Sequence, residues 1–162
     1  MLFDLLALWV LGAAVLWWLV ATILVLTYPD TSAYWSGAAC KLIIGLLVLL
    51  PAWQGLVLIK QWPLGNGLIL AVMVLVWGAD IGAYFSGKAF GKRKLAPRVS
   101  PGKSWEGVFG GLIASLLITA IVGMVRGWSG SQLLMGLLGA ASVVLISVVG
   151  DLTESMFKRQ AG

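Results

Sequence analysis

The sequence predicts an all-α integral membrane protein, a polytopic bundle of about five transmembrane helices with its polar site at the cytoplasmic end. Hydrophobic residues make up 60% of the chain and charged residues only 10%. The mean hydropathy is +1.01, and apolar runs of about 18 residues or more, long enough to cross a bilayer, recur along the chain. We therefore expect a single membrane domain over residues 1–162 and no soluble domain.

The breaks between the apolar runs set the limits of each span. The first run ends at a turn-like cluster, residues 27–30, and the second lies between Lys41 and Lys60. Pro51 is expected to kink or interrupt the second span, because proline removes a backbone donor. Glycine-rich and charged segments separate the later runs. The expected spans are residues 2–26, 42–59, 67–86, 105–125 and 132–157.

The basic residues predict the orientation of the spans. Residues 88–103 contain six lysines and arginines and no acidic residue, which is typical of a cytoplasmic loop. Lys41, Lys158 and Arg159 then lie on the same side, so that nine of the eleven basic residues are inside. We expect a cytoplasmic C-terminus and an external N-terminus, an arrangement that indicates further spans upstream.

Two residue types restrict the chemistry. The single cysteine, Cys40, excludes an internal disulfide, and the absence of histidine removes the commonest zinc ligand and general base. Any metal is therefore expected to be a hard cation that carboxylates hold.

The ionisable residues of the last three spans are expected at one membrane depth. Asp80, Lys103 and Glu106 lie at cytoplasmic span ends, and so do the charged residues within 151–159. A carboxylate inside a span costs roughly 2.5–3.5 kcal/mol on insertion scales, so it normally faces a polar cavity, a partner charge or a metal. This depth is where a site for an anionic substrate is expected.

The spacing of Asp151, Ser155 and Lys158 places them on one face of the last span, where carboxylate, hydroxyl and ammonium groups could hold a metal phosphate. The alternative is a salt bridge between Glu154 and Lys158, with Asp151 snorkelling to the interface.

Asp80 shares a helical face with Tyr84 and Lys88, among glycines that allow close backbone approach. The alternative for Asp80 is a structural pairing with a neighbouring helix. A second segment, Gly102-Lys103-Ser104, matches the end of a phosphate-binding P-loop, but the first glycine that motif requires is Pro97 here. We expect instead that a helix starts near Pro101, with Ser100 and Ser104 available as caps and Lys103 beside exposed amides that could bind phosphate.

Two stretches, WGADIGAYFSGKAFGKRKLAPRVSPGKSWEGVFGG and VVGDLTESMFKR, resemble the bacterial phosphatidate cytidylyltransferase (CDP-diacylglycerol synthase) family. The residues from Ser155 to Arg159 match the opening of the family signature. Its later elements, a Lys-Asp pair, a His-Gly-Gly turn and an Asp-Arg-x-Asp end, would follow Gly162. The resemblance therefore implies a portion of a larger enzyme, truncated at both ends.

The resemblance implies that CTP and phosphatidate give CDP-diacylglycerol and pyrophosphate with Mg²⁺, in the bacterial inner membrane, and it leaves a homodimer open. Nucleic acid is not an expected partner, because the sequence has no basic face with interleaved aromatic residues. The implied catalytic residues are Asp80, Lys103, Asp151 and Lys158. Substrate would contact Ser155, Arg159, Lys103 and Tyr84, and the metal would bind Asp151 and Asp80.

Membrane proteins with two other classes of function would also contain carboxylates buried in their spans. A transporter or proton relay would show gradient-driven flux and no consumption of CTP. A related membrane kinase acting on a lipid alcohol would transfer the γ-phosphate instead of releasing pyrophosphate. The truncation favours a third alternative, in which this chain by itself is an inactive fragment.

Overall fold

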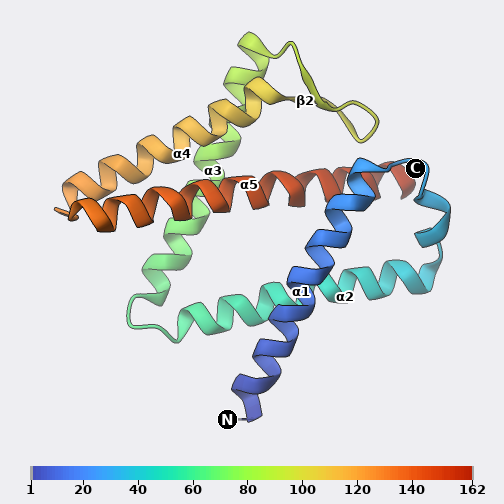
Figure 1. Cartoon of the computed structure of the whole chain (residues 1–162), viewed down its shortest axis with the longest axis horizontal. Coiled ribbons are helices and arrows are strands. Elements are labelled where there is room, and N and C mark those ends of the chain that lie inside the picture. The colour runs from blue at the N-terminus through green and yellow to red at the C-terminus, as the bar shows by residue number, and fades with distance from the viewer. Residues whose placement is uncertain (1, 162) are drawn as a thin grey trace. The chain divides into compact units, whose positions relative to one another are not determined.

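The protein is built from five long helices, seen in a computed structural model that describes the backbone of residues 2–161 and the side chains of residues 9–160 (Figure 1). Each helix is long and apolar enough to cross a membrane, which confirms the predicted all-α membrane architecture. The cytoplasmic position of the polar site stays a prediction. The helices are α1 (Leu2–Leu26), α2 (Ala38–Lys60), α3 (Gly65–Phe90), α4 (Trp105–Val125) and α5 (Gly130–Ala161). A short 3-10 helix, η1 (Ser32–Trp35), and two strands, β1 (Lys94–Ala96) and β2 (Ser100–Ser104), complete the fold.

The helix limits agree with the expected spans to within a few residues, except where helices continue beyond the apolar run. α2 begins before Lys41, and α5 continues past residue 157 through its basic last turn. The backbone hydrogen bonds of a helix do not require apolar side chains, so a helix can extend past the hydrocarbon core. Pro51 lies inside α2 without interrupting it.

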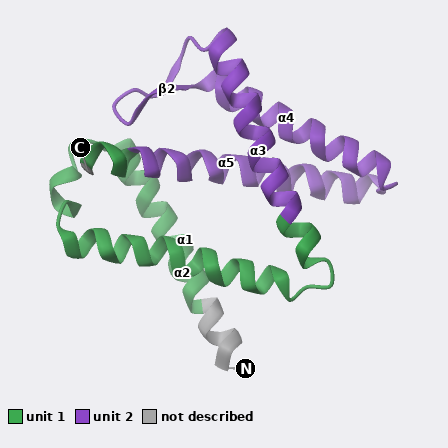
Figure 2. Ribbon diagram, turned by 180° about the vertical axis from the view of Figure 1, so that it is seen from behind, with its two compact units in different colours: residues 1–69, 156–162 green, residues 70–155 purple. Residues whose placement is uncertain are grey.

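Two compact units make up the structure, residues 1–69 with 156–162 and residues 70–155 (Figure 2). The expectation of a single membrane domain stays a prediction. In the first unit, α1 packs against α2. Trp35 of η1 stacks edge-on against Phe157, with the ring centroids 5.2 Å apart. The Gln160 side chain also donates a hydrogen bond to the Ser32 carbonyl oxygen at 2.8 Å.

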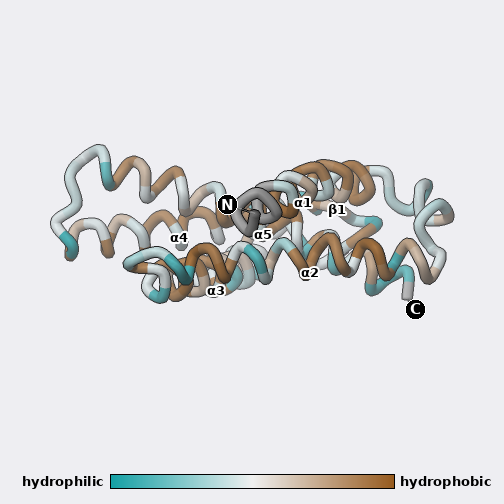
Figure 3. The backbone as a smooth tube through the Cα atoms, turned by 90° about the horizontal axis from the view of Figure 1, so that it is seen from below, coloured by the Kyte–Doolittle hydropathy of each residue, from teal (hydrophilic) through white to brown (hydrophobic). Residues whose placement is uncertain are grey.

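Many large apolar side chains are exposed, as expected for helices whose outer faces contact lipid. Leu26 is 79% exposed, Leu49 68% and Ile146 61%. Figure 3 shows hydrophobic stretches along α1 and α2 and hydrophilic residues at several of the turns. Faces this apolar would be unfavourable in water, and they match the hydrocarbon layer that the sequence predicts.

In the second unit, small residues let α3 and α4 approach closely. A Cβ atom added to Gly111 would lie 2.7 Å from the Ala79 carbonyl oxygen, and one added to Gly82 would lie 2.7 Å from the Gly110 carbonyl oxygen. The Ser115 hydroxyl donates to the Leu75 carbonyl oxygen at 3.0 Å across the same interface. These contacts are typical of small-residue packing between transmembrane helices.

Both ends of α4 are capped. The Ser104 hydroxyl accepts a hydrogen bond from the Gly107 amide at 3.2 Å, which makes Ser104 the N-cap. At the C-terminal end, Gly127 takes a φ of +64°. Its amide bonds the Met124 carbonyl oxygen, and the Trp128 amide bonds the Gly123 carbonyl oxygen. This pair of bonds forms a Schellman motif, which turns the chain towards α5.

An antiparallel hairpin of β1 and β2 joins α3 to α4, with Lys94 paired to Ser104 and Ala96 to Ser100. The prediction that a helix starts near Pro101 is therefore wrong: Pro101 and Lys103 lie in β2, and α4 begins at Trp105. Proline and glycine at 101 and 102 disfavour a helix interior, and the pairing with β1 is irregular opposite this segment, between Lys94 and Ala96. Val99, only 2% exposed, lies at the turn of the hairpin.

Candidate functional site

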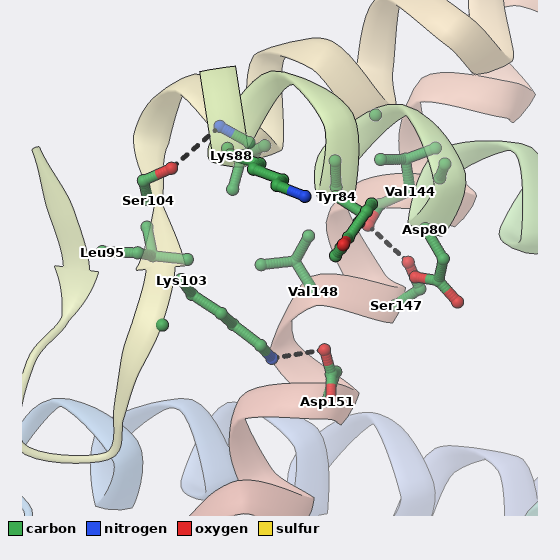
Figure 4. Close-up of a pocket in the computed structure, with 17 residues that line it drawn as sticks. Asp80, Tyr84, Lys88, Leu95, Lys103, Ser104, Val144, Ser147, Val148 and Asp151 are labelled. Atoms are coloured by element: carbon green, nitrogen blue, oxygen red, sulfur yellow. Dashed lines mark hydrogen bonds and ion pairs between the residues drawn. The ribbon is translucent and has the colours of Figure 1, made fainter. Parts of the chain in front are cut away.

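A pocket of about 440 Å³ lies within the second unit, between α3, the hairpin, α4 and α5. Its walls are largely glycine, alanine and valine, with a few polar side chains that point into it (Figure 4). The polar lining residues are Asp80, Tyr84, Lys88, Lys103, Ser104, Ser147 and Asp151. A mostly apolar cavity with a few convergent charged groups is typical of a ligand site.

The α3 wall carries Asp80, Tyr84 and Lys88, which recur every four residues and so project from one face of the helix. The Lys88 amine lies over the Tyr84 ring, 5.7 Å from its centroid. Gly82 and Gly78 contact α4 instead, so close packing of α3 on α4 leaves the polar face directed at the pocket.

The hairpin wall contributes Lys103, which reaches from β2 to α5. Its amine forms an ion pair with the carboxylate of Asp151 (Figure 4). The two side chains are 24% and 56% exposed. The amine nitrogen of Lys103 is itself buried. The pair therefore brings a cation from the basic loop, out of contact with solvent, beside a carboxylate of the last span.

Glu106 is adjacent in sequence to the pocket-lining residue Gly107, but its side chain bonds to the backbone of the hairpin. Both of its carboxylate oxygens accept the Arg93 backbone amide, each at 3.2 Å. The Trp105 amide donates to the Arg93 carbonyl oxygen at 2.9 Å, and the Ser86 hydroxyl donates to the Glu106 carbonyl oxygen at 3.0 Å. These bonds fix the base of the hairpin against α3 and α4, and so fix the strand that presents Lys103.

The predicted site residues fall into two groups. Four of them line the pocket described above: Asp80, Tyr84, Lys103 and Asp151. Ser155 follows Asp151 by one helical turn, is half-buried and does not line it. Lys158 and Arg159 are exposed in the last turn of α5, within the first unit. The roles expected for all of these residues stay predictions.

Three polar lining residues were not among the predicted site residues: Lys88, Ser104 and Ser147. Lys88 had a sequence signal, because it lies two four-residue steps beyond Asp80 on the same face. Ser147 lies one four-residue step before Asp151, and its hydroxyl donates to the Val144 carbonyl oxygen at 2.8 Å. A serine among apolar residues in a span gives no comparable signal.

The pocket contains two carboxylates that could serve as ligands to a magnesium ion. Asp80 and Asp151 offer hard oxygen ligands from two helices. Among the described residues no group of three or more acidic, histidine or cysteine side chains could hold a metal. Mg²⁺ needs only one or two carboxylates when water and substrate phosphates supply its other ligands, so two aspartates meet the requirement.

The whole chain, residues 1–162, matches the model of the cytidylyltransferase family. A phosphatidate cytidylyltransferase of Pseudomonas aeruginosa is 74% identical over 153 residues, which are 94% of this chain and 56% of the relative. One from Haemophilus influenzae is 45% identical, over 92% of this chain and 55% of the relative. The chain spans about half the length of these curated relatives. No solved structure matches it significantly.

Proposed function

Because this chain belongs to the cytidylyltransferase family, we propose that it supplies part of an enzyme that transfers the cytidylyl group of CTP to phosphatidate. The observation that carries the proposal is the pocket in which Lys103 pairs with Asp151 beside Asp80. Cations and carboxylates in one cavity are the groups needed to bind phosphates and a metal ion. The relatives that match most of the chain bear the name of this activity.

The reaction is a displacement at phosphorus. A phosphate oxygen of phosphatidate attacks the α-phosphorus of CTP, the bond between the α-phosphorus and the bridging oxygen breaks, and pyrophosphate leaves with the electron pair. The attacking oxygen is already ionised, so the reaction needs no general base. The protein must instead bring two polyanions together and stabilise the charge on the leaving group.

The residues of the pocket suit these two tasks. Lys103 would bind phosphate oxygens of the nucleotide, and Tyr84 would contact substrate from α3. Asp80 and Asp151 would hold magnesium, which when bound would offset charge on the pyrophosphate. Ser155, Lys158 and Arg159 follow Asp151 along α5, and we assign them contacts with substrate phosphates.

The Lys103–Asp151 ion pair has a part in this proposal. The carboxylate of Asp151 cannot fully serve both the Lys103 amine and a metal ion. In a nucleotide complex the Lys103 amine would bind phosphate oxygens, and the Asp151 carboxylate would then be available to hold magnesium.

We place the enzyme in the bacterial inner membrane, with the C-terminus of this chain in the cytoplasm. The five apolar helices and the basic loop around the hairpin support this placement. CTP is water-soluble and phosphatidate lies in the leaflet, so their reaction requires a site that both can reach at a membrane surface.

The test uses this chain in place of the matching segment of the Pseudomonas aeruginosa relative, which it covers over 153 residues. We call this protein the exchange enzyme. It is purified into vesicles that contain phosphatidate and is given CTP labelled at either the α- or the γ-phosphate. We expect the α-label in lipid and the γ-label in pyrophosphate. The γ-label in lipid would establish a kinase, and flux without CTP consumption would establish a transporter.

The matched variants are Asp151→Asn and Asp30→Asn. Both replace one aspartate with its amide, but Asp30 lies in the turn after α1, in the other unit. Asp151→Asn should abolish incorporation of the α-label while membrane insertion stays intact, whereas Asp30→Asn should remain active. Near-normal turnover in Asp151→Asn would exclude the metal-binding role of this residue.

A further inference from the structure

The pocket contains two lysines, and only one of them has its charge neutralised. Lys103 forms the ion pair with Asp151. Lys88 lines the same cavity from α3, yet no acidic side chain in the described part of the chain forms an ion pair with its amine. The pocket therefore holds one cation whose charge is still available to an incoming anion.

Contacts on α3 determine where this amine lies. The Tyr84 ring, one turn earlier, lies 5.7 Å from the Lys88 amine, within the range of a cation–π interaction. Figure 4 shows the Lys88 side chain running along α3 towards Tyr84. The aromatic face attracts the amine without forming an ion pair with it, which holds the amine near the cavity.

The end of α3 is also fixed against the hairpin. A Cβ atom on Gly87 would lie 3.4 Å from the Ser104 hydroxyl oxygen and 3.7 Å from the Gly107 Cα atom. Lys88 and Lys103 thus extend from two backbone segments in close contact, α3 and β2, and both line one cavity. Two cations held on separate walls suit a ligand with several anionic oxygens.

We propose that Lys88 is a phosphate-binding residue of this pocket, which binds a phosphate oxygen from the α3 wall while Lys103 binds from the hairpin wall. This inference rests on the proposed function and adds a ligand contact to it. A lysine amine binds phosphate as a point charge, without the fixed geometry that arginine requires. The phosphate could belong to the nucleotide or to the lipid headgroup, because both carry the same anionic oxygens.

The first experiment measures binding of inorganic pyrophosphate to the 162-residue chain by titration calorimetry in detergent micelles. The variants are Lys88→Gln, Lys88→Arg and the matched control Lys92→Gln, which removes an exposed charge outside the pocket. We expect Lys88→Gln to weaken binding by about tenfold, as the loss of one charged hydrogen bond predicts. Lys88→Arg should retain most of the affinity, and Lys92→Gln should match the unsubstituted chain.

Equal pyrophosphate affinity in Lys88→Gln and Lys92→Gln would overturn the proposal. Thermal unfolding of each variant, followed by tryptophan fluorescence, separates this result from misfolding. If Lys88→Gln fails to fold, Lys88→Met, which keeps the length and apolar stem of the side chain, replaces it in the same comparison.

The second experiment identifies the source of the phosphate with the exchange enzyme. A higher KM for CTP in Lys88→Gln assigns the contact to the nucleotide, and a higher KM for phosphatidate, as mole fraction in the vesicle, assigns it to the lipid. Unchanged KM values for both would refute a role of Lys88 in binding either substrate. An inactive unsubstituted exchange enzyme would count against the proposed function alone, since pyrophosphate binding tests Lys88 without turnover.

Discussion

Gly111→Ala should destabilise the protein, because this glycine lies where α3 and α4 are in contact. The added Cβ atom would stand 2.7 Å from the Ala79 carbonyl oxygen and 3.4 Å from the Ala83 Cβ atom. Non-bonded heavy atoms attract each other at roughly 3.5–4.0 Å, so the first contact is repulsive. A main-chain oxygen within a helix cannot turn aside as a side chain can. The strain must therefore move one helix relative to the other.

The expected magnitude follows from two opposing effects. Overpacking of a well-packed interface costs about 1–3 kcal/mol. Alanine is favoured over glycine in a helix by about 0.8–1 kcal/mol, which offsets part of that cost. The net destabilisation should be about 1 kcal/mol, the difference between the middle of the first range and the second effect. The matched control is Gly139→Ala in α5, where an added Cβ atom would meet no atom within 4 Å; there the helix preference acts alone, and the control should be neutral or slightly stabilising.

The assay is unfolding by sodium dodecyl sulfate in mixed micelles, followed by the fluorescence of the nine tryptophans. Gly111→Ala should unfold at a lower detergent fraction than the unsubstituted chain, and Gly139→Ala at the same or a higher fraction. If both variants unfold together, close packing of α4 on α3 at Gly111 does not contribute to stability, and the reasoning is refuted.

Three further predictions concern the pocket and the cap of α4. Lys103→Ala in the exchange enzyme should raise the KM for CTP about tenfold or more through loss of a charged contact; an unchanged CTP dependence would exclude the assigned role. Ser104→Ala removes the N-cap bond to Gly107 and should lower the unfolding free energy by about 0.5–2 kcal/mol, whereas Ser142→Ala, at an exposed helical serine, should have a smaller effect. Chelation with EDTA should stop CTP incorporation and added Mg²⁺ should restore it; full activity in EDTA would contradict magnesium binding.

The spans were predictable because their signal is local. A run of apolar residues can cross the bilayer only as a helix, since each backbone donor and acceptor must be satisfied within the segment. Hydropathy therefore located all five helices, and charged or glycine-rich segments located the turns. The same principle of periodicity put Asp80 and Tyr84 on one face of α3, and the structure agrees by placing both in the pocket.

Hydropathy and periodicity could not predict the hairpin. Its strands are short and polar, and its register depends on pairing between Lys94 and Ser104, which no local pattern specifies. The role of Glu106 was hidden for a similar reason. A carboxylate at a span end indicates a polar environment, but only the folded loop shows that its partner is the Arg93 amide.

Composition and residue order were thus sufficient to predict a membrane-embedded helical protein and to place a set of charged residues at the ends of three spans. They could not specify which of those charges meet. The ion pair of Lys103 with Asp151 and the position of Lys88 over Tyr84 depend on how closely α3 packs against α4 and on the direction in which the hairpin leaves them. Contacts between segments distant in sequence arise from packing, and packing exists only in the folded chain.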